Sequence, residues 1–449
     1  MITLTGATMC GWSARPRARA AAAFFFHAFS RATNAHAGTL RLEIEGKRGE
    51  FFYDRMLSLN GRFHILHNAV NKKTGEVDVI AQAYELPAFT PIGPPVTIAH
   101  IPFDPRSLEM TTGFRSRIET SEDGEHVILF FDRIKSKEDE QLILVFAMDA
   151  DLNARWKQAY RIPFQADRIG TYGVKVSDQG IVYALMRSRF ANRAIKNKSV
   201  NFSFELFGLA QEGMAAQPVD LPGGMAALSA GLAMQQGRPV VAGFHVEPHH
   251  TTKETAGYFV STFDPALGAA PETRTQAFPQ VLDERVWDLE LIKRQDGGLY
   301  LSGGAQQQVT NRIWDHFIAT VAMDKTGAHE WDVVVPRRVY NIEYGEMGYA
   351  AMEGKDHLVL VFREPPQNLE RYLNGEEPKA VMTWNRVTVC AAIDGQGRIH
   401  YRELSDEGLD FKHSHFLRWA ETAPYEQAAF GQKKIGKKEV DGAVIATFH

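Results

Sequence analysis

The sequence predicts an all-β fold made of repeated four-stranded antiparallel sheets, and two features that recur along the chain predict it. One is a turn glycine followed by a short apolar strand. The other is an aspartate that ends an apolar strand seven residues before an aromatic residue that begins the next strand. The apolar runs are short, rich in Val, Ile, Phe and Tyr, and bounded by Gly, Asp or Asn, as β-strands are. No segment shows a long helical period.

The turn glycine recurs at nearly equal intervals. Successive copies lie 63, 56, 57, 61 and 56 residues apart. They are Gly61, Gly124, Gly180, Gly237, Gly298 and Gly354. Such a period holds about four short strands, which we expect in the second period at residues 114–119, 126–131, 142–148 and 156–162. A fixed internal period indicates a fold built from one repeated unit.

The aspartate marker runs in phase with the glycines. Its copies are Asp149 with Trp156, Asp324 with Trp331, and Asp394 with Tyr401. An aspartate side chain can accept hydrogen bonds from backbone N–H groups just ahead of it in a tight turn. We therefore expect each of these aspartates to open the turn between the third and fourth strands of its repeat.

Four antiparallel strands per repeat of about 57 residues form the blade of a β-propeller, and over about 410 residues the chain resembles the β-propeller superfamily. The resemblance is to the architecture and not to one family, because the Trp-Asp pairs of the sequence are not spaced one per blade. It implies a single domain over residues 38–449 with seven blades; one misread period would make six or eight. The blades are predicted at 50–104, 108–163, 168–221, 224–278, 285–336, 343–404 and 409–449.

The seventh blade is predicted to take one strand from the other end of the domain. Residues 409–449 have room for only three strands. Leu40, Leu42 and Ile44 alternate with charged residues, which is the pattern of a half-buried strand. We expect residues 39–46 to supply the fourth strand and close the ring, because closure removes the sheet edge that an open array exposes.

Residues 1–37 are predicted to be a targeting segment. Three arginines at 15, 17 and 19 precede the apolar stretch 20–29, and Ala35-His36-Ala37 follows. A charged region, a short apolar region and a small-residue site together are typical of a secretory signal. We expect an exported protein in the periplasm, the cell envelope or the extracellular space. An organelle transit peptide is the alternative, since the segment is rich in Arg and lacks acids.

Composition excludes several classes of function. A net charge of −4 argues against a general nucleic-acid binder. Two cysteines exclude a disulfide-dense scaffold and a Cys-rich metal site. No apolar run is long enough to predict a membrane-spanning helix. We expect no cofactor, and no catalytic residue is assigned.

Candidate binding residues lie in one long loop and on the innermost strands. In a propeller the long loops between second and third strands emerge on one face, where function commonly resides. The blade-three loop carries five cations and no acid: Arg187, Arg189, Arg193, Lys196 and Lys198. A basic loop on an acidic protein attracts an anionic partner. The innermost-strand candidates, expected to line a central channel, are Arg115, Arg117, Trp287, His413 and His415.

Two further segments have more than one interpretation. His245, Glu247 and His249 alternate and form a weak candidate for a divalent metal site, although their spacing matches no known zinc signature. The insertion 364–378 in blade six has Leu369, Tyr372 and Leu373 at helical spacing. It predicts one helical turn that would cap the channel mouth, contact a partner or pack onto its own blade.

The leading hypothesis is an exported binding scaffold whose long-loop face takes a protein or an anionic polymer of the cell envelope. The alternative is a carbohydrate-active enzyme, a hydrolase or lyase, acting at the mouth of the central channel. Two carboxylates, or a histidine with a carboxylate, converging at one point would favour the enzyme. A metal-dependent propeller that uses the blade-four histidines is a third hypothesis.

Overall fold

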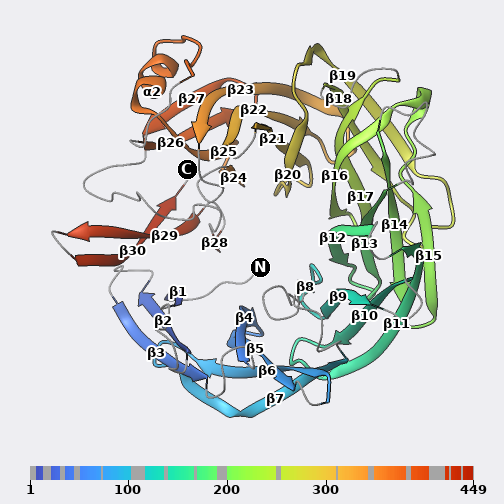
Figure 1. Cartoon of the computed structure of the whole chain (residues 1–449), viewed down its shortest axis with the longest axis vertical. Helices are drawn as coiled ribbons and strands as arrows, with labels where there is room; N and C mark the ends of the chain where they lie inside the picture. The colour runs from blue at the N-terminus through green and yellow to red at the C-terminus, as the bar shows by residue number, and fades with distance from the viewer. Residues whose placement is uncertain are drawn as a thin grey trace. The chain divides into compact units, whose positions relative to one another are not determined.

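The computed structural model of the chain is almost entirely β-strand in the residues that it describes (Figure 1). These residues are 7–13, 22–30, 36–44, 51–71, 74–102, 117–135, 140–165, 169–189, 200–248, 254–309, 312–341, 348–380, 386–403, 420–423, 426–435 and 438–447. They include one α-helix, α2 (Pro366–Leu373), and one short 3-10 helix, η2 (Pro222–Gly224).

Six consecutive sheets each contain four antiparallel strands in chain order. Blade one has β4 (Phe51–Leu59), β5 (Arg62–Asn71), β6 (Glu76–Glu85) and β7 (Thr90–Pro102). Blade two has β8 (Arg117–Thr120), β9 (Val127–Lys135), β10 (Glu140–Met148) and β11 (Ala154–Gln165). Blade three has β12 (Ile169–Val176), β13 (Val182–Arg189), β14 (Phe202–Ala210) and β15 (Gly213–Pro218).

The next three blades repeat this order. Blade four has β16 (Ala226–Gln235), β17 (Arg238–Val246), β18 (Thr255–Thr262) and β19 (Glu272–Leu282). Blade five has β20 (Val286–Lys293), β21 (Leu299–Val309), β22 (Arg312–Met323) and β23 (His329–Asn341). Blade six has β24 (Tyr349–Glu353), β25 (His357–Glu364), β26 (Val387–Asp394) and β27 (Ile399–Glu403). Repeated four-stranded meanders are propeller blades, so the predicted all-β class and the resemblance to the β-propeller superfamily are confirmed.

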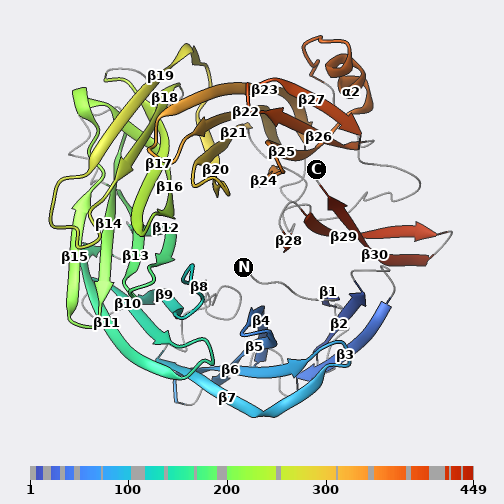
Figure 2. The same cartoon turned by 180° about the vertical axis from the view of Figure 1, so that it is seen from behind.

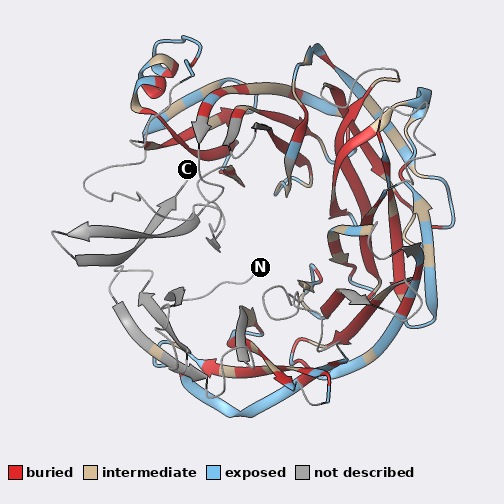
Figure 3. Ribbon diagram, viewed as in Figure 1, coloured by how far each residue is buried: buried red, intermediate tan, exposed pale blue. Residues whose placement is uncertain are grey.

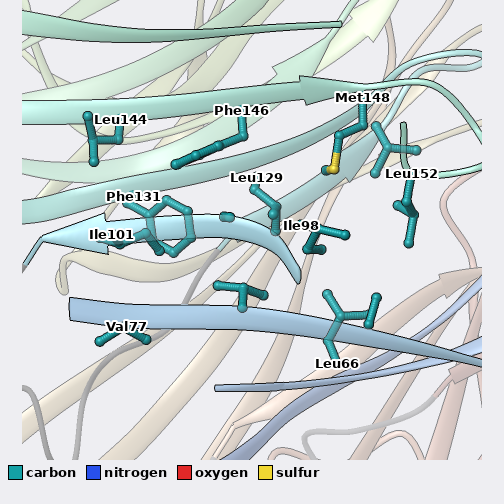
Figure 4. Packing of buried hydrophobic residues seen from close by; sticks show 14 of the residues in the cluster. Leu66, Val77, Ile98, Ile101, Leu129, Phe131, Leu144, Phe146, Met148 and Leu152 are labelled. Atoms are coloured by element: carbon teal, nitrogen blue, oxygen red, sulfur yellow. The ribbon is translucent and has the colours of Figure 1, made fainter. Parts of the chain in front are cut away.

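The chain divides into two compact units, residues 1–184 with 207–215, and residues 185–206 with 216–449. In the first unit, blades one and two share an apolar core that includes Leu66, Ile101, Leu129 and Phe146 (Figure 4). In the second unit, one core joins blades four and five and another joins blades five and six. In blade four, burial is concentrated on the two middle strands. β17 and β18 are almost wholly buried, whereas the fourth strand, β19, is largely exposed (Figure 3).

The aspartate marker forms the turn that the sequence predicts. Oδ1 of Asp324 accepts hydrogen bonds from the N–H groups of Thr326 (2.7 Å) and Ala328 (2.9 Å). Asp149 and Asp394 make the same pair of bonds to the residues two and four positions ahead. The repeat signal in the sequence is therefore a recurring turn between the third and fourth strands.

The blade-six insertion packs onto its own blade, which is one of the three positions that the sequence left open. The ring of Tyr372 in α2 stacks on Tyr401 of β27, with centroids 4.6 Å apart and planes 13° apart. Leu369 joins the core between blades five and six. Both views show α2 beside β27 (Figures 1 and 2).

The two ends of the chain form three-stranded sheets that differ from the predicted seventh blade. β1 (Ala7–Ser13) pairs with β2 (Ala22–Ser30), and β2 pairs with β3 (His36–Ile44). β28 (Ala420–Ala423), β29 (Glu426–Ile435) and β30 (Lys438–Thr447) form the other sheet. Within the described residues β3 is paired with β2 and not with β28–β30. The reason lies in residues 22–30, because a run of three phenylalanines at 24–26 has high β propensity and offers a partner strand close in sequence.

Candidate functional site

Four side chains of the second unit form a stack in which guanidinium groups and aromatic rings alternate. Cζ of Arg187 lies 4.9 Å from the centre of the Phe202 ring. Cζ of Arg285 lies 5.0 Å from the same ring and 3.5 Å from the ring of Trp287. Each guanidinium thus contacts an aromatic face, where the ring's negative quadrupole attracts a cation. We call Arg187, Phe202, Arg285 and Trp287 the Trp287 stack.

The members of the stack lie at one end of the blades, beside the loop between the second and third strands of blade three and beside the connection from blade four to blade five. Arg187 lies near the end of β13, and Phe202 is the first residue of β14. Arg285 immediately precedes β20, and Trp287 is the second residue of that strand. The stack therefore lies at the long-loop end of the blades, which is where binding residues were expected.

Trp287 is the extra residue of a β-bulge. In blade five, Val286 pairs with Ala305 and Asp288 pairs with Gly304, which leaves Trp287 without a partner in the register. Bulges redirect a side chain and are frequent beside functional sites.

Blade four has a bulge at the equivalent place, and its extra residue is Leu228. Leu228 is 1% exposed, whereas Trp287 is 48% exposed. The scaffold can therefore fill this position with a buried aliphatic side chain. Core packing does not account for an exposed tryptophan there, and a large exposed aromatic is a candidate contact for a partner.

The guanidinium of Arg285 packs against one face of the Trp287 indole, and hydrogen bonds keep Arg285 in place. Its Nη2 donates a hydrogen bond of 2.9 Å to the carbonyl oxygen of Leu228 in blade four. The hydroxyl of Thr255 donates to the carbonyl of Glu284 (2.9 Å) and accepts from the N–H of Val286 (3.2 Å), so the backbone is tied on both sides of Arg285. Arg285 is 8% exposed as a residue, and its guanidinium covers one face of the indole.

A histidine and a carboxylate lie close to each other, and the carboxylate belongs to Glu284, the residue that directly precedes Arg285 of the stack. Nε2 of His316 lies 3.8 Å from Oε1 of Glu284, and both side chains are partly exposed. This separation is longer than a hydrogen bond. His316 is also the extra residue of a bulge, because Phe317 pairs with Ala305 while Asp315 pairs with Gln306. The pair is of the type expected for acid–base chemistry.

A buried charge network joins blades five and six, and it includes Asp315, the residue before His316. Nη1 of Arg337 lies 3.1 Å from Oδ2 of Asp315, and its Nε lies 3.5 Å from Oε2 of Glu364. Burial raises the pKa of both carboxyl groups, and the Arg337 cation opposes that rise. Asn368 of α2 donates to Glu364 at 2.8 Å, which ties the helix to the network. We interpret these groups as structural, because almost none of their surface reaches solvent.

The structure brings together two of the predicted site residues, Arg187 and Trp287, through two that sequence reasoning missed, Phe202 and Arg285. Local alternation could not have shown that Arg285 supports Trp287, because Arg285 precedes β20 and Trp287 is the extra residue of a bulge. Arg189 ends β13 and is exposed.

The other predicted residues are placed elsewhere or lie outside the described part of the chain. Arg117 donates from Nη2 to the carbonyl of Thr171 at 2.7 Å, which links the first strands of blades two and three. The predicted residues outside the described ranges are Arg115, Arg193, Lys196, Lys198, His413 and His415.

The weak metal candidate is only partly described. His245 is buried at the end of β17, and this burial lowers the pKa of its imidazole. Glu247 follows the strand, and His249 lies outside the described residues. Within the described ranges, no three His, Cys, Asp or Glu side chains gather closely enough to hold a metal ion.

Comparison with known proteins finds similarity only to solved structures, at low sequence identity. No protein-family model matches it, and no curated protein matches it. The polysaccharide lyase Uly1 is a similar solved structure, with a TM-score of 0.45 and 9% identity over 91% of this chain and 94% of that one. The β-propeller domain of the Trilobed protease from Pyrococcus furiosus has a TM-score of 0.39 and 10% identity over 88% of this chain and 96% of that one. Cobalt-substituted Synechocystis ACO has a TM-score of 0.39 and 11% identity over 90% and 91%. Similarities of this size support no statement about activity.

In the part of the chain that is described, no helix has both the length and the apolar character needed to cross a membrane.

Proposed function

We propose that this protein is a binding protein that takes an anionic polymer at the long-loop end of its blades, with Trp287 as the central contact. The observation that carries the proposal is the stack itself. An exposed indole stands at a bulged position where blade four has a buried leucine, and a buried, hydrogen-bonded arginine supports one of its faces. Rigid aromatic side chains supported in this way are typical central contacts of binding surfaces.

The charge of the adjoining loop selects an anionic partner. Residues 187–198 contain five cations and no acid in a chain of net charge −4. β13 ends at Arg189 and β14 begins at Phe202, and Arg187 near the end of β13 contacts Phe202 in the stack. Arg187 therefore adds positive charge to the stack that contains Trp287, and the cations of this segment would attract a polyanion over about one Debye length, ~8–10 Å.

The same proposal includes export and a seventh blade. If residues 1–37 are removed as a secretory signal, β1 and β2 are lost, and β3 loses the strand with which it pairs. An unpaired strand edge is unfavourable. Residues 39–46 are then free to complete the three-stranded sheet β28–β30 and close a seven-bladed ring.

Retardation in native gels cast with a polymer tests the proposed function. Gels containing polygalacturonate, alginate or poly-L-glutamate should retard the protein, and gels containing neutral dextran should not. Replacing Arg187 and Arg189 together with serine should weaken retardation, whereas Lys355→Ser, at an exposed lysine of a blade-six turn, should leave it unchanged. Equal mobility in all gels would contradict the proposal. Binding of an envelope protein without binding of any polyanion would favour a protein partner instead.

The His316–Glu284 pair supports a second candidate, cleavage of a carbohydrate chain near the same surface. A histidine beside a carboxylate is the arrangement that the enzymatic hypothesis requires. Incubation with the retained polymer should then release new reducing ends or unsaturated sugars, and His316→Ala should abolish release without changing retardation. Release that continues in the His316→Ala protein would exclude this pair.

A further inference from the structure

We infer that the polymer is an acidic carbohydrate chain, with one sugar ring stacked on the exposed face of Trp287 and neighbouring carboxylates paired with Arg187 and Arg189 at the end of β13. The inference rests on the proposed function and names the chemical class of its ligand. It depends on three properties of the stack, which are one available indole face, a fixed guanidinium support on the opposite face, and a further cation, Arg187, in the same stack.

The exposed face of Trp287 suits a flat apolar ring. Arg285 covers the indole at 3.5 Å, so the ligand is left with the opposite face and the ring edge. Trp287 is half exposed although its support is almost fully buried. A sugar ring presents a flat array of C–H groups on one face and hydroxyls at its rim. It can therefore cover the indole without leaving its polar groups unpaired, which would otherwise oppose binding.

Arg285 is a positioning residue in this arrangement. Its guanidinium is occupied by the carbonyl of Leu228 and by the rings of Phe202 and Trp287. It therefore fixes the tilt of the indole and is not the partner of a ligand carboxylate. The ligand's carboxylates are left to Arg187 and Arg189 on β13, because a guanidinium group can pair with a carboxylate through two hydrogen bonds.

Two other polyanions fit the stack less well. A single-stranded nucleic acid binds through successive bases on successive aromatic side chains in a positive groove. Here one tryptophan supplies the stacking surface, and the chain as a whole carries 54 acidic and 50 basic residues. An acidic polypeptide supplies carboxylates but no regularly repeated ring to cover the indole. A chain that carries a ring and a carboxylate in each unit matches both features of the surface.

Isothermal titration of the full chain with four polymers tests the inference. Polygalacturonate and alginate carry a carboxylate on each sugar ring, highly methyl-esterified pectin keeps the rings but has lost most of the charge, and poly-L-glutamate has the charge without the rings. The two acidic glycans should bind at least about tenfold more tightly than either comparison polymer. Trp287→Ala should weaken glycan binding at least about tenfold, as truncation of a central contact does, and Trp287→Phe should weaken it less.

Leu373→Ala is the matched control, because Leu373 is also exposed and apolar but lies on α2. Leu373→Ala should leave the affinity for every polymer unchanged. Circular dichroism should confirm that the Trp287→Ala and Leu373→Ala proteins are folded. If poly-L-glutamate binds as tightly as the glycans and Trp287→Ala changes neither affinity, the inference is wrong while the proposed function stands. If no polyanion binds, the proposed function fails as well. Tighter binding of oligo-dT than of either glycan would overturn the inference in favour of a nucleic acid.

Discussion

The two ends of the blades are held together by different chemistry. At the short-turn end, neighbouring blades are joined by hydrogen bonds that use turn backbone: Nε2 of Gln235 donates to the carbonyl of Gly297 at 2.6 Å, and the N–H of Gln295 donates to Glu353 at 2.8 Å. At the long-loop end of the same unit, neighbouring blades are joined by buried arginines, Arg285 between blades four and five and Arg337 between blades five and six.

Of the two ends, the long-loop end is the one that carries side chains suited to binding or chemistry, and the short-turn end carries few. Backbone hydrogen bonds in tight turns tolerate many sequences and bring few reactive groups. Buried guanidinium groups require partners, because an unpaired buried charge is strongly destabilising. The arginines therefore order the aromatic and acidic groups around them, and that order is what a binding site needs.

The largest effect is expected from breaking the charge network at the long-loop end. Arg337→Leu removes the buried cation that contacts the carboxylates of both Asp315 and Glu364. The free energy of unfolding should fall by about 3–5 kcal/mol, measured by urea denaturation. Arg398→Leu, which removes an exposed partner of Asp394, is the control and should cost less than about 1 kcal/mol. Equal losses in the two variants would show that the network is not held as the structure indicates.

The next prediction compares the two equivalent bulge positions. Leu228→Ala removes a fully buried side chain and should lower the free energy of unfolding by about 2–5 kcal/mol. Trp287→Ala removes a larger side chain that is half exposed, and should cost only about 1 kcal/mol, mainly through the lost contact with Arg285. If the tryptophan variant proved the less stable of the two, Trp287 would be a packing residue and its proposed binding role would lose its basis.

The short-turn end is tested by two glycines with the same backbone conformation. Gly180 has φ +78° and a Cβ there would lie 2.9 Å from the His126 ring, whereas Gly124 has φ +79° and no atom within 4 Å of its Cβ position. Gly124→Ala should cost about 1–2 kcal/mol for the left-handed conformation alone. Gly180→Ala should lower the free energy of unfolding by more than this. When His126→Ala is added, the cost of Gly180→Ala should fall to the cost of Gly124→Ala. An unchanged cost in the double variant would mean that the two turns do not pack together.

The sequence predicted the short-turn end of the blades better than the long-loop end, and the reason is physical. Turn glycines and turn aspartates act within a few residues of themselves, so the spacing of Asp324 and Trp331 already contained the turn that the structure shows. The Trp287 stack takes its members from blades three and five, and contacts such as Arg285 with Phe202 have no signature in local sequence. Basic charge identified Arg187 as a candidate, but only the fold reveals the aromatic side chain that it contacts.

The smallest effect concerns the pH dependence of a single turn. Hydrogen bonds from the backbone N–H groups of Arg398 and Gln396, with the Arg398 guanidinium, lower the pKa of Asp394 to about 2. A carboxyl whose pKa is lowered by folding stabilises the fold above its unfolded pKa of about 4, and that contribution is lost as the pH falls towards 2. Asp394→Asn keeps an acceptor oxygen but cannot ionise. The variant should therefore unfold at lower urea concentration than the natural chain at pH 6, and the gap should narrow steadily between pH 4 and pH 2. A gap of constant width would mean that the stability difference does not come from the charge of Asp394, and equal urea midpoints at every pH would mean that asparagine serves this turn as well as aspartate.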